Sequence, residues 1–161
     1  MKILSLDQST KCTGYCVTED GRITDWGVLE PTRKKDVVNI RMEEMFFKIK
    51  GLVEAAQPDF LVMEGTQYQN NANSFNILSK LQGLIIAIAF LTNLGFYIVE
   101  PTCWKSFCDI KGRRREEQKA NTKQFVAERY DIIATEDEAD AIGIATWAVA
   151  NITAIAKAKG M

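Results

Sequence analysis

The stretch KILSLDQSTKCTGYCVTED (residues 2–20) determines how the chain begins to fold. Its two apolar runs, KILSLDQ and TGYCVTED, have the length and composition of β-strands, and a Glu19-Asp20-Gly21 turn follows them. The run ITDWGVLE (residues 23–30) predicts a third strand. We therefore expect the chain to open with an antiparallel meander of three strands.

The middle of the chain alternates between helical and strand patterns. Apolar residues recur every three or four positions over residues 36–56, which indicates an amphipathic helix, and Pro58 then introduces the strand DFLVMEG (residues 59–65). A long helix is predicted from about Asn73, with Gly95 ending it before the strand FYIVEP. This helix is apolar on almost every side, so one of its surfaces must face another element or a second subunit.

The C-terminal third is predicted to be helical. REEQKANTKQFVAERY (residues 115–130) forms one segment, and a second helix opens at Thr135, where Thr135 and Glu138 have the spacing of a capping box. No internal repeat, Pro-rich linker or change of composition marks a second domain. We therefore predict that residues 1–161 form a single α/β domain with a mixed sheet.

The composition allows a well-packed core, and the charged residues are unevenly distributed along the chain. The 161 residues are 47% hydrophobic, and the net charge of −1 with a pI near 5.6 excludes a protein that coats nucleic acid through bulk positive charge. Between Pro101 and Lys123, however, seven basic residues stand against three acidic ones. This segment is able to meet phosphates even though the whole chain is slightly acidic.

Two apolar segments are too short to be a targeting or membrane signal. The N-terminal MKILSLDQ is too short for a signal peptide and is interrupted by Asp7, and LIIAIAFL (residues 84–91) is far below the roughly 18 residues of a membrane span. We therefore expect a cytoplasmic protein with no membrane partner.

The cysteines and the absence of histidine restrict the chemistry. Cys12, Cys16, Cys103 and Cys108 lack C-x-x-C spacing, which favours reduced cysteines packed as small apolar residues over a structural zinc site. The chain contains no histidine, so Ser-His-Asp and Cys-His catalysis are impossible within it. Proton transfer must then involve a carboxylate, a lysine, a tyrosine or metal-bound water.

Four carboxylates stand where the predicted elements begin or end. Asp7 ends the first strand, Glu64 ends the fourth, and Asp137 and Asp140 share one face of the last helix's first turn. An ionised carboxylate beside an apolar run is costly unless a cation or hydrogen bonds compensate it. Taken singly, each acid has an ordinary explanation as a turn residue, an ion-pair partner or a helix-terminal charge.

Together the four acids predict a catalytic metal site for phosphodiester hydrolysis. Such a reaction needs a water activated at neutral pH and relief of charge on the attacked phosphate, and two cations about 4 Å apart supply both. Four carboxylates suffice as protein ligands because Mg²⁺ takes its remaining ligands from water and substrate phosphates.

Three stretches carry a resemblance to a known family. LSLDQSTKCTGY (residues 4–15), VMEGTQYQNNANSFNILSKLQG (residues 62–83) and EDEADAIGIATWA (residues 136–148) resemble the successive motifs of RuvC-type Holliday junction resolvases. The resemblance covers nearly the whole chain and depends on four acids in the family's order and spacing, together with the D-x-A-D-A ending. A phage-encoded version is consistent with the small size and the divergent loops.

The resemblance implies an RNase H-like fold with a mixed five-stranded sheet and flanking helices. It also implies two Mg²⁺ ions per active site, with Mn²⁺ as a substitute, and a homodimer that cuts Holliday junctions and other branched DNA. The paired, symmetric nicks would leave 5′-phosphate and 3′-hydroxyl ends. The family's metal-binding acids match Asp7, Glu64, Asp137 and Asp140, and its basic residues near the scissile strand match Lys105 and Lys119.

Further DNA contacts and a dimer surface are expected. Gln67 occupies the place where the family often has an aromatic wedge, and Tyr68 is the next candidate to stack on an unpaired base. The run Arg113, Arg114 and Arg115 is expected to hold the DNA backbone, with a solvated loop as the alternative. Asn73, Ser74, Leu81 and Gly83 are the predicted dimer contacts, and core packing within one subunit is the competing explanation.

Two other functions are alternatives to a resolvase. LDQSTKCTG also resembles the phosphate loop of actin-like sugar kinases that bind ATP, but the chain lacks the second domain and the Gly-rich adenosine segment of those proteins. The alternative from another class is a catalytically silent junction-binding protein. No motif identifies a branch-migration motor as a partner.

Overall fold

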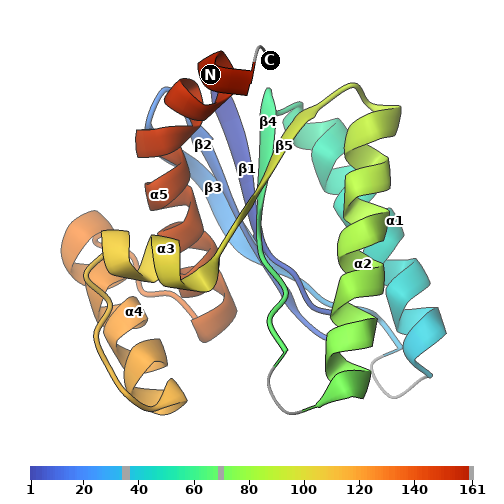
Figure 1. Ribbon diagram of the computed structural model, residues 1–161, viewed down its shortest axis with the longest axis horizontal. Coiled ribbons are helices and arrows are strands. Elements are labelled where there is room, and N and C mark those ends of the chain that lie inside the picture. The colour runs from blue at the N-terminus through green and yellow to red at the C-terminus, as the bar shows by residue number, and fades with distance from the viewer. Residues whose placement is uncertain (34–36, 69–70, 160–161) are drawn as a thin grey trace.

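Five strands form one mixed sheet in the order β3-β2-β1-β4-β5, which lies at the centre of Figure 1. The structure is a computed structural model that describes residues 1–33, 37–68 and 71–159. The antiparallel meander consists of β1 (Lys2–Asp7), β2 (Thr13–Glu19) and β3 (Arg22–Leu29), and parallel strands β4 (Phe60–Glu64) and β5 (Gly95–Val99) extend the sheet from β1. The predicted meander and the mixed five-stranded sheet are confirmed.

The hairpin between β2 and β3 turns on two residues with positive φ. Asp20 has φ of 49° and Gly21 has φ of 81°. Two successive residues in this region match the right-handed twist of the flanking strands. The Asp-Gly pair therefore sets the register of the meander.

The helices lie on both faces of the sheet. Figure 1 shows α1 (Val38–Ala56) and α2 (Ala72–Leu91) on one side of the strands, and α3 (Pro101–Phe107), α4 (Arg115–Tyr130) and α5 (Glu136–Lys159) on the other. The bounds of α4 match the predicted segment. The short helix α3 was not predicted separately; it begins at Pro101, whose fixed φ suits the first position of a helix.

The predicted end of α2 at Gly95 is wrong. The helix ends at Leu91, and Asn93 with φ of 52° turns the chain toward β5. Gly95 instead begins β5, where a Cβ atom would lie 2.6 Å from the ring of Phe60. Its small size therefore serves the contact between β4 and β5.

Alternation along the strands divides the core into two layers. Leu4, Leu6, Leu61 and Met63 face α1 and α2, whereas Ile3, Phe60 and Val62 belong to the cluster around α3 and α5. Since successive side chains of a strand point to opposite faces, Asp7 is in phase with Ile3, and Glu64 is in phase with Phe60 and Val62. Both strand-terminal acids therefore point to the α5 side.

The start of α5 is set by the predicted capping box. The Thr135 N–H donates to Glu138 Oε2 at 2.7 Å, and the Glu138 N–H donates to Thr135 Oγ1 at 3.4 Å. These reciprocal bonds satisfy two donors that the first turn leaves unpaired. The capping-box prediction is confirmed.

Cysteines and apolar helices complete the core. The four cysteines, which all lie in the described part of the chain, form no disulfide with one another, and Cys16 and Cys108 are buried. By length and composition alone, α2 and residues 136–157 of α5 are long and apolar enough to cross a membrane. The core of the chain itself uses their apolar residues, among them Ile85 and Ile88 of α2 and Ile144 and Ile152 of α5. The expected absence of a membrane partner stays a prediction.

A close contact between β2 and α5 generates a stability prediction. A Cβ atom at Gly14 would lie 1.9 Å from the carbonyl oxygen of Asp137. The substitution Gly14→Ala must push the first turn of α5 off the sheet, and we expect it to lower the free energy of unfolding by about 1 to 3 kcal/mol or more. Urea denaturation measures the change.

The matched control is Gly51→Ala in α1, where an added Cβ atom meets nothing within 4 Å. Alanine is favoured over glycine in a helix, so this variant should gain up to about 1 kcal/mol. Equal stabilities for Gly14→Ala and the wild type would contradict the close approach.

Candidate active site

The first two acids meet because their strands are neighbours. β1 and β4 run parallel, with Leu6 opposite Met63 in the ladder. The next residue on each strand is the acid, so Asp7 and Glu64 lie side by side at the C-terminal ends of β1 and β4. Both residues are half-buried.

The other two acids come from the first turn of α5. In the ladder between β1 and β2, Asp7 pairs with Gly14, and Gly14 in turn is the position that the Asp137 carbonyl closely approaches. This contact brings the turn that carries Asp137 and Asp140 to the end of β1. The structure therefore places the four predicted acids at one edge of the sheet.

Burial and the proximity of other charges shift the pKa values of Asp7, Glu64 and Asp140. Burial raises the pKa of Asp7 well above its usual value, and the negative charges of Glu64, Asp140 and Asp137 raise it further. Burial, followed by the charge of Glu64, raises the pKa of Asp140 to about 6. Burial also raises the pKa of Glu64, although a hydrogen bond from Trp104 and nearby cations oppose the shift. The cluster thus carries more negative charge than its surroundings compensate.

The residues fit a divalent cation by chemistry. Carboxylate oxygens are the ligands that Mg²⁺ prefers, and a cation would lower the repulsion among the four acids. Among the residues that the structure describes, however, no group of three Asp, Glu, Cys or His side chains is close enough together to hold a metal ion as it stands. The donor types and the electrostatics favour a cation, and the carboxylate groups would have to draw together to ligate one.

Glu64 is held by three residues that sequence reasoning missed. The indole Nε1–H of Trp104 donates to Glu64 Oε1 at 2.8 Å. The side-chain amides of Gln8 and Gln82 donate to the Glu64 backbone carbonyl at 2.6 Å and 3.0 Å. Gln8 is next to Asp7 and Trp104 is next to Lys105, but nothing in their spacing points to Glu64.

Comparisons with known proteins show which proteins the chain resembles. No model of a known protein family matches the chain. Proteins named crossover junction endodeoxyribonuclease RuvC are similar along their length: the protein from Chloroherpeton thalassium is 29% identical, covering 90% of this chain and 80% of its own. The one from Dehalococcoides mccartyi is 27% identical, covering 95% and 98%.

Solved structures show the same fold. Thermus thermophilus RuvC in complex with a Holliday junction substrate superposes with a TM-score of 0.73 at 14% identity, covering 99% of this chain and 96% of that one. The resemblance to RuvC-type resolvases is confirmed. The yeast mitochondrial Holliday junction resolvase Ydc2 has a TM-score of 0.58 at 17% identity, covering 91% and 78%. These matches give no support to a phage origin of the RuvC-like chain.

Both predicted lysines of the RuvC-like chain lie near its acids. Lys105 Nζ is 5.3 Å from the ring centre of Trp104, and its charge acts on Asp7, Glu64 and Asp140. Lys119 forms an ion pair with Glu136 and is close enough for its charge to act on Asp140. The cations therefore border the carboxylate cluster on the α3 and α4 side.

The arginine run is split by the structure. Arg115 is the first residue of α4, and its charge acts on Glu64 and Glu136. Arg113 and Arg114 are exposed in the preceding loop, and Arg114 forms an ion pair with Glu117 at 3.3 Å. For Arg113 and Arg114 the solvated-loop alternative describes their surroundings, whereas Arg115 belongs with the active-site cations.

The predicted wedge residues occupy the loop after β4. Gln67 and Tyr68 are exposed, and the ring of Tyr68 meets Phe75 edge to face at 6.1 Å. This places an accessible aromatic ring a few residues beyond Glu64. Its contact with a DNA base stays a prediction.

The predicted dimer residues differ in exposure. Asn73, Ser74 and Gly83 are exposed on α2, and a Cβ atom at Gly83 would meet nothing within 4 Å. Leu81 is fully buried in the core cluster with α1 and the sheet. Its assignment to the dimer surface is therefore corrected: core packing within the subunit explains Leu81.

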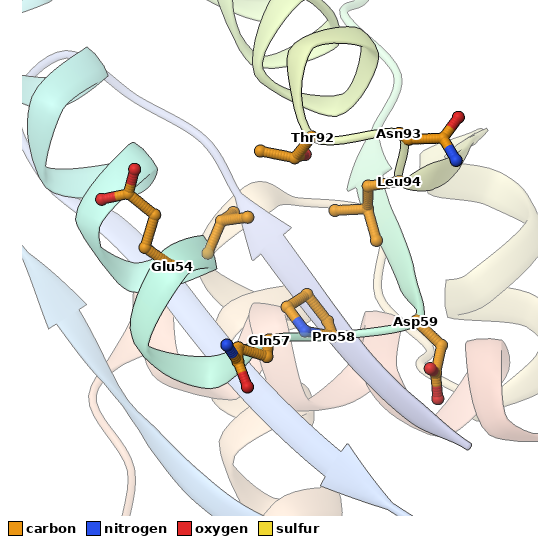
Figure 2. Close-up of a pocket in the computed structure, with 8 residues that line it drawn as sticks. Glu54, Gln57, Pro58, Asp59, Thr92, Asn93 and Leu94 are labelled. Carbon is orange, nitrogen blue, oxygen red and sulfur yellow. The ribbon is translucent and has the colours of Figure 1, made fainter.

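A surface hollow lies at the opposite end of the sheet from the acids. Figure 2 shows it between the ends of α1 and α2 and the start of β4, with Gln57 and Pro58 on one side and Thr92 and Leu94 on the other. Its acids already have partners: Glu54 pairs with Lys50, and Asp59 accepts the Lys2 N–H at 2.7 Å. We assign no chemistry to this hollow.

The raised pKa of Asp140 generates a prediction about stability and pH. The folded state favours the protonated form of Asp140 up to about pH 6, whereas an unfolded aspartate loses its proton near pH 4. The ionised carboxylate therefore costs folding stability that is absent below about pH 4 and fully developed above about pH 6. In EDTA, we expect Asp140→Asn to match the wild type at pH 4 and to exceed its free energy of unfolding by about 1 to 3 kcal/mol at pH 7.5.

Urea denaturation at several pH values tests the expectation, with Glu43→Gln, an exposed acid on α1, as the control. A stability difference that does not grow between pH 4 and pH 7.5 would count against the crowded carboxylate cluster.

Proposed function

We propose that the chain is a divalent-metal-dependent endonuclease that resolves Holliday junctions and related branched DNA by paired symmetric nicks. The observation that carries the proposal is that strand pairing and the close approach of α5 to Gly14 bring Asp7, Glu64, Asp137 and Asp140 to the C-terminal ends of β1 and β4 in a RuvC-like sheet. Similar proteins named as crossover junction endodeoxyribonucleases support the substrate class. The products would carry 5′-phosphate and 3′-hydroxyl ends.

The four acids would hold two Mg²⁺ ions, with Mn²⁺ as a substitute. When bound, such ions activate a water and neutralise charge on the attacked phosphate and the leaving oxygen. The chain's part is to supply oxygen ligands from three separate elements, held by strand pairing and by the capped start of α5. Glu64 is further fixed by its bonds from Trp104, Gln8 and Gln82.

The neighbouring cations would place the scissile strand. Lys105 and Arg115 act on Glu64 from the α3 and α4 side, so a phosphate approaching the acids meets positive charge there. Lys119 would exchange its Glu136 partner for a DNA phosphate when the strand binds. These contacts orient the backbone and carry no direct sequence information.

A homodimer would give the paired cuts. Two copies related by a two-fold axis match a two-fold junction, and the exposed α2 residues Asn73, Ser74 and Gly83 are the proposed contacts. Tyr68, and with it Gln67, would meet bases at the centre of the junction. The proposed setting is the cytoplasm.

The first test compares a labelled synthetic four-way junction with linear duplex, in Mg²⁺ and in EDTA. We expect ligatable paired nicks only in Mg²⁺ and mainly on the junction. Asp7→Asn should lose cleavage by at least about a hundredfold, since it removes a metal ligand, and should keep junction binding because it lowers negative charge near DNA. Retained cleavage in a folded Asp7→Asn protein would refute the assignment. Junction binding without cuts by the wild type would favour the catalytically silent alternative.

The second test separates the arginines. Arg115→Gln should lower the single-turnover cleavage rate about tenfold or more, since a charge-assisted contact contributes about 1.5 to 3 kcal/mol. Arg113→Gln is the matched control: the same change, two residues away in the exposed loop, should leave the rate within about threefold. Equal effects of the two substitutions would mean that the run acts only as a general phosphate contact.

A further inference from the structure

We propose that Trp104 is a positioning residue that holds the Glu64 carboxylate ready for metal binding, an inference that rests on the proposed nuclease function. The contact is direct: the indole Nε1–H donates to Glu64 Oε1 at 2.8 Å. It joins α3 to the end of β4 across 40 positions of sequence. Residues that orient a metal ligand in this way affect metal affinity without touching the ion.

The backbone of Glu64 is already fixed by other contacts. β4 pairs with β1 on one side and with β5 on the other, where Glu64 lies opposite Val99. Gln8, directly after β1, and Gln82 of α2 donate to its carbonyl oxygen. The remaining freedom of Glu64 is rotation of its side chain, and the bond from Trp104 acts on that rotation.

One indole donor leaves most of the carboxylate available. A carboxylate has two oxygens with about four acceptor positions, and a single N–H occupies one of them. Oε2 and the second lone pair of Oε1 are therefore free of Trp104. The bond can persist when a cation is ligated, so that Trp104 would set the direction in which Glu64 presents its oxygens.

Trp104 is itself held rigidly. Its side chain is fully buried, and it lies in the core cluster formed by β4, α3 and α5. The ring packs against Gly143 of α5, where a Cβ atom would lie 2.5 Å from it. Gly143 is three residues beyond Asp140 on the same helix, so this packing contact ties Trp104 to the helix that carries Asp137 and Asp140.

The same ring supports a cation. Lys105 Nζ lies 5.3 Å from the ring centre of Trp104, within the range of a cation–π contact. Trp104 therefore contacts both a proposed metal ligand and a proposed phosphate-binding lysine. A tryptophan with only a packing role would need an acceptor for its N–H, but not a carboxylate of the metal cluster.

The test compares Trp104→Phe with Trp147→Phe. Both residues are tryptophans of the same core cluster, and Trp147 stacks on Tyr97 at 5.5 Å, away from Glu64. We expect Trp104→Phe to raise the Mg²⁺ concentration for half-maximal junction cleavage by about 10- to 100-fold, with partial rescue at high Mg²⁺ and unchanged junction binding in EDTA. Trp147→Phe should keep the wild-type Mg²⁺ dependence.

A second measurement reads metal binding without cleavage. The chain has three tryptophans, so Trp26→Phe/Trp147→Phe leaves Trp104 as the sole indole fluorophore. Titrating this protein with Mg²⁺ in the absence of DNA should change the Trp104 emission, because the acceptor of its hydrogen bond becomes a metal ligand. Adding Asp140→Asn should weaken the response. This titration also decides the matter if Trp104→Phe does not fold.

The outcomes separate the two proposals. A wild-type protein that does not cleave junctions in Mg²⁺ or Mn²⁺ overturns the proposed function and the positioning role with it. A wild-type protein that cleaves, together with a folded Trp104→Phe variant of unchanged Mg²⁺ dependence, overturns the positioning role alone. If the wild type cleaves junctions but Mg²⁺ does not change the Trp104 emission of the Trp26→Phe/Trp147→Phe protein, the positioning role is likewise overturned.

Discussion

Repulsion among four carboxylates at one sheet edge is the constraint on which the remaining structure depends. Strand pairing brings Asp7 beside Glu64, and the start of α5 adds Asp137 and Asp140. Folding must supply enough favourable packing to hold these like charges together in partly buried positions. The glycine at position 14, the capping box and the indole of Trp104 all act at the places where this repulsion would otherwise open the structure.

The site therefore favours function over the stability of the metal-free chain. Neutral residues at the same edge would pack more favourably, since buried charge is costly without a partner. Lys105 and Arg115 reduce the cost without neutralising the cluster. If the chain's own lysines and arginines neutralised all four carboxylates, the site would have no electrostatic need for an added metal ion. The uncompensated negative charge is therefore itself a property of the site.

Much of the fold could be predicted because its signals are local. The Asp-Gly turn, the helical periodicity over residues 36–56 and the Thr135 capping box each depend on residues that are close together in the sequence. The acids could be singled out because they interrupt apolar runs. The bond between Trp104 and Glu64 could not, since it joins residues 40 positions apart. Leu81 was misassigned because a helix that is apolar all round does not reveal which side faces its own core.

The spacing of Asp7 and Glu64 is set inside the ladder between β1 and β4, not by the loops that leave it. The segment after Glu64 can therefore change in length or composition without altering the distance between these two acids. The acids at the strand ends and the exposed residues that follow Glu64 therefore belong to parts of the chain that can vary separately. The exposed Gln67 and Tyr68 can therefore be exchanged without moving the two carboxylates at the strand ends.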